Sequence, residues 1–115
     1  MKIRTYSVDG IEVVEPKGKL LGGEDTGELD QKLYALLGRD VTSVVVDLAH
    51  TDWMNSSGLA ILLHHFKKFR DKGGNLVLAN LTNKIERILV ISRLALVFQV
   101  YDSVEEAVGS FKKKG

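Results

Sequence analysis

The chain has 115 residues, of which 44% are hydrophobic and 27% charged, and its formal net charge is +1. These values predict one globular domain over residues 1–115 and argue against a nucleic-acid partner, because binding to phosphates requires a concentrated positive field. The absence of cysteine excludes disulfides and thiol chemistry. No apolar run exceeds five residues, against roughly 20 in a membrane span, and no secretory signal is visible, so we expect a cytoplasmic protein without a membrane segment.

The N-terminal region has the pattern of a β-hairpin. Residues 2–8 and 11–15 are β-prone stretches, and Asp9-Gly10 between them is a two-residue signal for a type I′ turn. Pro16 and the glycines that follow it break this pattern. They predict a flexible connection between the hairpin and the next element.

Helices and strands are expected to alternate after the hairpin. A helix capped by Asp25 or Thr26 carries four leucines at helical spacing, and residues 43–48 form an apolar strand suited to a sheet covered on both faces. Residues 57–72 form a second helix, because large apolar residues recur on one face. The remaining elements are a strand over 75–79, a helix capped by Thr82, a strand over 97–100 and a helix whose capping box begins at Ser103.

This order predicts an α/β fold with a mixed β-sheet, in which the N-terminal hairpin is followed by parallel strands and about four helices flank the sheet.

The sequence lacks the usual motifs of enzymes and metalloproteins. Gly18-Lys19 superficially resembles a phosphate loop, but the other glycine and the Ser or Thr of that motif are absent. His64 and His65 are neighbours on a predicted helix, so their side chains diverge by about 100° and cannot close on one ion. Ser56 lacks the flanking glycine of a nucleophile elbow. We therefore expect no catalytic residue, no metal and no cofactor.

The polar segment Asn55-Ser56-Ser57-Gly58 stands out, because it follows an apolar strand at the point where α/β domains usually carry function. Its simplest interpretation is structural: Ser56 or Ser57 is the N-cap of the following helix, worth roughly 1 kcal/mol. Capping accounts for one serine and leaves the other polar residues unexplained. Trp53, just before the segment, is interpreted as a core or loop anchor.

Together with the Val-Val-Val-Asp-Leu strand before it, Asn55-Ser56-Ser57-Gly58-Leu59 resembles the D-S-[ST]-G-L signature of the STAS domain family of bacterial anti-sigma factor antagonists. The resemblance covers essentially the whole chain. This sequence departs from the family pattern at three places: Asn55 replaces the acidic residue, Gly18-Lys19-Leu20-Leu21 lacks the Asp of a turn, and Ser92-Arg93-Leu94 replaces Ser-Gly-Leu.

The resemblance implies a partner-switching protein that is not an enzyme. In its unphosphorylated form it would bind an anti-sigma factor with serine kinase activity and so free the sigma factor. Phosphorylation, which the resemblance places on Ser56, would end this binding, and a serine phosphatase would restore it. The alternative is a constitutive STAS interaction or small-ligand-binding subunit, in which Ser56 is only a cap.

Candidate partner-binding residues come from the signature, from the glycine loop that precedes the first predicted helix and from the helix face opposite the phenylalanines. They are Asn55, Ser56, Ser57, Gly58, Ala60, Ile61, His64, Gly22 and Gly23.

Overall fold

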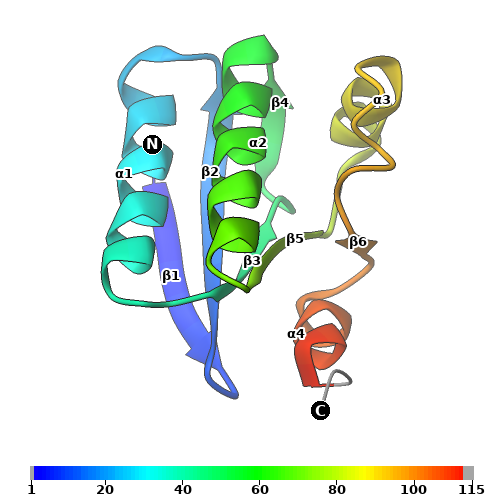
Figure 1. The fold of residues 1–115 in the computed structure, drawn as a ribbon. Coiled ribbons are helices and arrows are strands. Elements are labelled where there is room, and N and C mark those ends of the chain that lie inside the picture. Colours follow the sequence, from blue (N-terminus) through cyan, green and yellow to red (C-terminus); the bar gives the residue numbers. More distant parts are fainter. Residues whose placement is uncertain (1, 113–115) are drawn as a thin grey trace.

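The computed structural model describes residues 2–112 and has an α/β fold with a mixed sheet and four helices in that range (Figure 1). Its elements in chain order are β1 (Lys2–Val8), β2 (Ile11–Leu20), α1 (Gly23–Gly38), β3 (Ser43–Asp47), β4 (Thr51–Met54), α2 (Ser56–Asp71), β5 (Asn75–Ala79), α3 (Asn83–Ile91), β6 (Val100–Tyr101) and α4 (Val104–Lys112). The predicted fold class is therefore confirmed.

The strands lie in the order β1-β2-β3-β5-β6, and β4 pairs with the end of β2. β1 and β2 are antiparallel, whereas the pairs β2–β3, β3–β5 and β5–β6 are parallel. Asp9 and Gly10 connect the hairpin with φ angles of 52° and 82°, and a type I′ turn requires such positive values at both central residues. The predicted hairpin, followed by parallel strands, is confirmed.

The sheet has an apolar layer on each face. α1 and α2 lie side by side over one face (Figure 1), where Val44 and Val46 of β3 join the larger core cluster. Val45 points to the other face and packs near Ala107 and Val108 of α4. Because successive strand residues alternate between faces, the three consecutive valines at the centre of β3 are what a sheet covered on both sides requires.

The flexible connection predicted at Pro16 is wrong, because β2 continues to Leu20. The end of β2 gains a second partner, β4, which pairs with it from Gly18 onward. The Thr51 hydroxyl at the start of β4 donates to the Pro16 carbonyl at 3.2 Å. β4 has only four residues and was not predicted, so the support that it gives to β2 was not apparent from the sequence.

Two further boundaries differ from the prediction. α1 begins at Gly23, with Gly22 as its N-cap, and is not capped by Asp25 or Thr26. Thr26 acts from inside the helix, where its hydroxyl accepts a hydrogen bond from the Gly22 backbone N–H at 2.7 Å. The last strand is Val100–Tyr101, two residues long, in place of residues 97–100.

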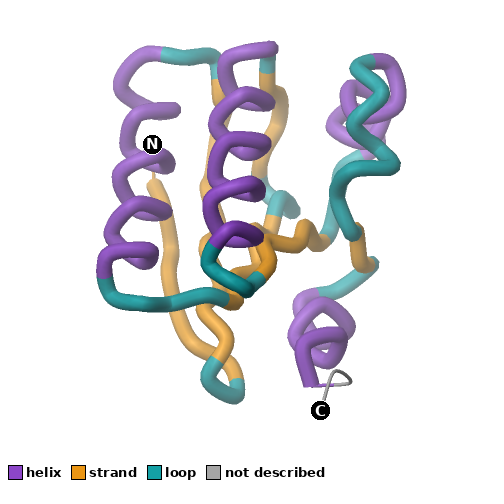
Figure 2. Tube along the Cα trace, in the orientation of Figure 1, coloured by secondary structure: helices purple, strands orange, loops and turns teal. Residues whose placement is uncertain are grey.

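The second half of the chain otherwise agrees with the sequence. Thr82 caps α3 by accepting a hydrogen bond from the backbone N–H of Ile85 at 3.3 Å. At the start of α4, the Ser103 hydroxyl accepts from the Glu106 backbone N–H at 3.1 Å, which is one of the two bonds of a capping box. Figure 2 shows that the β2–α1 loop and the junction between β4 and α2 lie at the same end of the molecule.

Candidate functional site

Asn55 is the N-cap of α2, so the prediction that Ser56 or Ser57 caps the helix is wrong. Its backbone is extended, and its Oδ1 accepts hydrogen bonds from the backbone N–H groups of Ser57 at 3.0 Å and Gly58 at 3.3 Å. This satisfies two of the backbone donors that a helix leaves unpaired at its N-terminus. The asparagine stands one residue before the first helical position, which is where a cap must be.

Neither serine is therefore needed to cap α2. Ser56 and Ser57 are exposed in the first turn of α2. Ser57 lies beside the β2–α1 loop: a Cβ added to Gly22 would lie 3.5 Å from its Cβ and Oγ. The hydroxyl of Ser56 is left on the outer surface of the helix terminus.

Gly58 has a different role from the one the sequence suggested. It is buried, and a Cβ added there would lie 2.7 Å from the Leu20 carbonyl oxygen and 2.9 Å from the Leu20 Cβ. Glycine at this position lets α2 approach the end of β2. Gly58 is therefore a packing residue of α2, and because it is buried it is not available for contact with a partner.

The β2–α1 loop is bound to the start of α2. The Asn55 side-chain amide donates to the Leu21 carbonyl at 2.9 Å, and its backbone N–H donates to the Leu20 carbonyl at 3.1 Å. Gly22 and Gly23 follow with φ angles of 92° and 72°, which favour glycine. The structure therefore brings the predicted glycine loop and the serine segment together. The contribution of Leu21, a backbone carbonyl, had no signal in the sequence.

The outer face of α2 extends from this end. Ala60 and His64 are exposed, as predicted, whereas Ile61 is half-buried and lies outside both core clusters. His64 Nε2 lies 2.7 Å from the hydroxyl of Tyr34 on α1, which is itself 46% exposed. Tyr34 therefore belongs to this surface, although sequence reasoning did not include it. Trp53 on β4 is also exposed, against the expected core or loop anchor.

His65, unlike His64, is fully buried between α1 and α2. Its Nε2–H donates to the Asp30 carboxylate of α1 at 2.6 Å. Burial lowers the pKa of His65, and the Asp30 carboxylate opposes that shift. This buried, hydrogen-bonded histidine joins the two helices that carry the surface.

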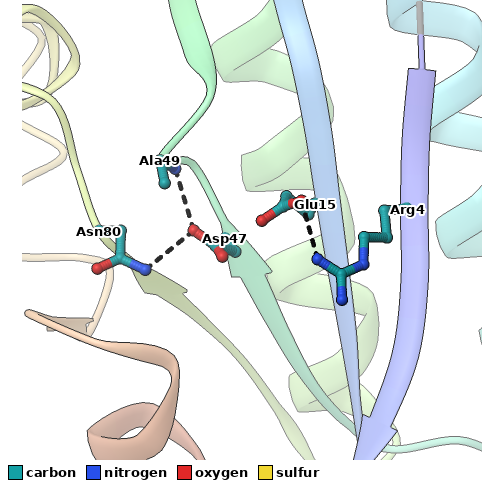
Figure 3. Close-up of polar contacts among 5 residues, drawn as sticks. All are labelled: Arg4, Glu15, Asp47, Ala49 and Asn80. Carbon is teal, nitrogen blue, oxygen red and sulfur yellow. Dashed lines mark hydrogen bonds and ion pairs between the residues drawn. The ribbon is translucent and has the colours of Figure 1, made fainter.

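Two buried carboxylates, Asp47 and Glu15, have polar partners within or beside the sheet (Figure 3). Asp47 accepts hydrogen bonds from the Ala49 backbone N–H at 3.0 Å and from the Asn80 side-chain amide at 3.1 Å, while Glu15 lies 3.9 Å from Arg4. These pairings account for the two acidic side chains structurally. Within residues 2–112, no group of three or more His, Asp or Glu side chains could hold a metal ion.

A cavity of about 590 Å³ lies beyond Asn80, at the carboxyl ends of β5 and β6. Its lining includes Asn80, Thr82, Glu86, Leu89, Val90 and Tyr101. It was not predicted, because its walls come from α3, β6 and four loops that meet only in the folded chain. None of the helices in the described part of the chain is long and apolar enough to cross a membrane.

Comparison with known proteins gives a consistent result. The sequence profile of the STAS domain family matches residues 2–107. BtrV of Bordetella bronchiseptica, assigned as an anti-sigma factor antagonist, is 30% identical over 112 residues, which cover 97% of this chain and 96% of BtrV.

Solved structures share the fold. A Thermotoga maritima protein assigned as an anti-sigma factor antagonist superposes with a TM-score of 0.87 at 20% identity, over 94% of this chain and 92% of that protein. The Bacillus cell-fate determinant SpoIIAA in its phosphorylated form superposes with a TM-score of 0.76 at 18% identity, over 96% and 99% of the two chains.

Proposed function

The chain belongs to the STAS domain family, and from that premise we propose that it is an anti-sigma factor antagonist switched off by phosphorylation of Ser56. The observation that carries the proposal is the exposed Ser56 hydroxyl on the first turn of α2, where Asn55 and not the serine caps the helix. The names of BtrV and of the Thermotoga protein support an anti-sigma factor as partner. The phosphorylated form of SpoIIAA supports a switch of this kind.

In this proposal the protein is a cytoplasmic binding module. It has no catalytic residue, metal or cofactor of its own, and its partners are an anti-sigma factor with serine kinase activity and a serine phosphatase. The signature residue Ser56 accepts the phosphate. The docking surface consists of residues around it that are exposed or half-buried: Gly22, Gly23, Asn55, Ser57, Ala60, Ile61 and His64.

The fold should tolerate the modification. A phosphate on Ser56 meets the positive end of the α2 dipole, which stabilises a negative charge by about 0.3–1 kcal/mol. The first turn of α2 contains no acidic residue that would repel it. Phosphorylation therefore changes the charge of the surface without unfolding the domain.

The same charge is unfavourable beneath a docked partner. A phosphoserine carries nearly two negative charges, and burying them in an interface costs about 3 kcal/mol, or about two orders of magnitude in affinity. A local modification at the helix terminus thus decides whether the partner binds.

Kinase assays and binding titrations test the proposal. After incubation with the cognate kinase, intact mass should show one phosphate, which Ser56→Ala abolishes and Ser57→Ala reduces at most in part. Ser56→Asp should weaken binding to the unmodified anti-sigma factor tenfold or more, whereas Ser56→Ala still binds, because charge decides the outcome. Phosphate mapped to Ser57, or equal dissociation constants for the two Ser56 variants, would contradict the switch.

The cavity beside α3 favours a second candidate, a constitutive interaction or small-ligand-binding subunit. Its volume of about 590 Å³ is within the range of small-molecule sites, and it lies at the strand ends where α/β proteins bind ligands. In that case, partner binding would be the same for the Ser56→Ala and Ser56→Asp variants. The titrations above therefore separate the two candidates.

A further inference from the structure

We infer that Asn55 is a positioning residue: its side-chain amide holds the Gly22–Gly23 loop against the start of α2, so that both parts of the proposed docking surface are preformed in the free chain. The consequence for partner binding rests on the proposed function. The loop attachment itself is a property of the isolated protein and can be measured without a partner.

Asn55 uses the two ends of its amide for different tasks. The oxygen accepts from the Ser57 and Gly58 backbone N–H groups, and the nitrogen donates to the Leu21 carbonyl at 2.9 Å. The opposite orientation of the amide would place its oxygen against a carbonyl and its N–H₂ group against backbone donors. The hydrogen-bond partners therefore define the orientation, and they require a side chain that both accepts and donates.

An aspartate could perform only the first task. One carboxylate oxygen would still cap α2, but the second would lie at hydrogen-bond distance from the Leu21 carbonyl, and both atoms are acceptors. The contact would change from attractive to repulsive. The asparagine that replaces the acidic residue of the family signature thus adds a link between α2 and the loop.

The loop needs this link because the backbone bond of Asn55 reaches only Leu20, at the end of β2, and not the loop itself. Leu21 is 49% exposed, so its side chain does not anchor the loop by burial. Gly22 and Gly23 both have positive φ angles, and glycine gives the unfolded or open loop many alternative conformations. The hydrogen bond from the Gly22 N–H to Thr26 joins the loop to α1 and not to α2.

Two substitutions distinguish the contribution of the Asn55–Leu21 hydrogen bond from the contributions of helix capping and of charge. Asn55→Ser keeps an oxygen that can cap the helix, adds no charge and is too short to reach Leu21 as well. Asn55→Asp keeps the cap and adds a charge. Thr82→Ser is the matched control, because it alters an N-cap of the same kind on α3, away from the loop.

Amide hydrogen exchange in the free chain measures the link. In wild type, the Asn55 side-chain amide protons should be protected. In both Asn55 variants the backbone amide of residue 55, which donates to the Leu20 carbonyl, should exchange at least tenfold faster, because the adjoining loop is no longer held by the side chain. In Asn55→Asp the Ser57 and Gly58 amides should keep their protection, and Thr82→Ser should leave the residue 55 amide unchanged. Wild-type exchange of that amide in both Asn55 variants would overturn the inference, as would equal loss of protection along all of α2.

Binding to the unmodified anti-sigma factor measures the consequence. Asn55→Ser should bind at least fivefold more weakly than wild type, whereas Thr82→Ser binds equally. If only Asn55→Asp binds weakly, the added charge decides and the positioning role at the interface is wrong. If wild type itself does not bind, the proposed function fails, while the exchange experiment still decides whether Asn55 holds the loop.

Discussion

Two of the polar contacts between α2 and the α1 side of the molecule differ in depth and chemistry. The His65–Asp30 pair is in the helix interface, with the histidine fully buried, whereas the Asn55–Leu21 bond lies at the exposed end. The buried pair includes a titratable group, so its contribution to stability depends on pH. The exposed bond joins neutral groups on a glycine loop, where opening exposes little apolar surface and the loop can adapt to a partner.

The comparison indicates that different parts of α2 have different roles. The inner residues of α2 supply stability, and its first turn supplies the proposed switch. Substitutions should therefore separate the two properties, and the following predictions proceed from the largest expected effect on stability to the smallest.

Leu62→Ala should lower the free energy of unfolding by roughly 2–5 kcal/mol, because Leu62 is completely buried. This is the usual loss when a core leucine is truncated to alanine. Chemical unfolding followed by circular dichroism measures this loss. Lys67→Ala, an exposed position on the same helix, is the control and should stay within about 0.5 kcal/mol of wild type. Similar losses for both variants would show that α2 has no distinct inner face.

Gly58→Ala should lower the free energy of unfolding by about 1–3 kcal/mol, because the new Cβ meets the Leu20 carbonyl and no flexible side chain can give way. Gly27→Ala in α1 is the matched control. A Cβ there meets nothing within 4 Å, so the better helix propensity of alanine should stabilise the chain by about 0.5–1 kcal/mol. A stabilising Gly58→Ala would contradict the close approach of α2 to β2.

The stability of the chain should fall as the pH is lowered from above 7 toward 5. Burial lowers the pKa of His65 in the folded state, so the unfolded state binds the proton more readily. The stabilisation is complete above the unfolded-state value of about 6.5 and is lost as the pH falls toward the folded-state pKa, by at most about 1.4 kcal/mol per pH unit. Urea unfolding at several pH values measures this slope.

Matched histidine variants identify the group responsible for the pH effect. His65→Asn keeps an N–H₂ donor for Asp30 without titrating in this range, so the slope should become shallower. His64→Ala removes the exposed neighbour and should leave the slope in place. A slope that is lost in His64→Ala and kept in His65→Asn would contradict the assignment to His65.

The hairpin and the inner face of α2 were predictable because their signals are local. Asp9-Gly10 is a turn dipeptide whose conformational preference acts within four residues, and the apolar spacing in residues 57–72 defines a helix face without reference to the rest of the chain. The serine segment was also found from the sequence, through its polar residues after an apolar strand and its resemblance to a family signature.

Other features of the site were decided by tertiary structure. β4 forms because the end of β2 offers it a pairing edge, and Gly58 is required because α2 crosses that same end. His65 appeared from the sequence as one half of an unremarkable histidine pair, and its contact with Asp30 depends on the packing of α1 against α2. Contacts of this kind join residues about 35 positions apart, so they produce no periodic pattern in the sequence.

The sequence by itself determined the order of the elements except β4, the hairpin and the position of the serines, since backbone propensity and apolar periodicity act over a few residues. Only the tertiary structure decided that Asn55 is the cap, that Ser56 is therefore free, and that the Leu21 carbonyl lies within 2.9 Å of the asparagine amide. The physical reason is that a cap and a loop contact depend on where the chain turns and which backbone groups remain unpaired there. Those groups are defined only once β2, β4 and α2 have come together.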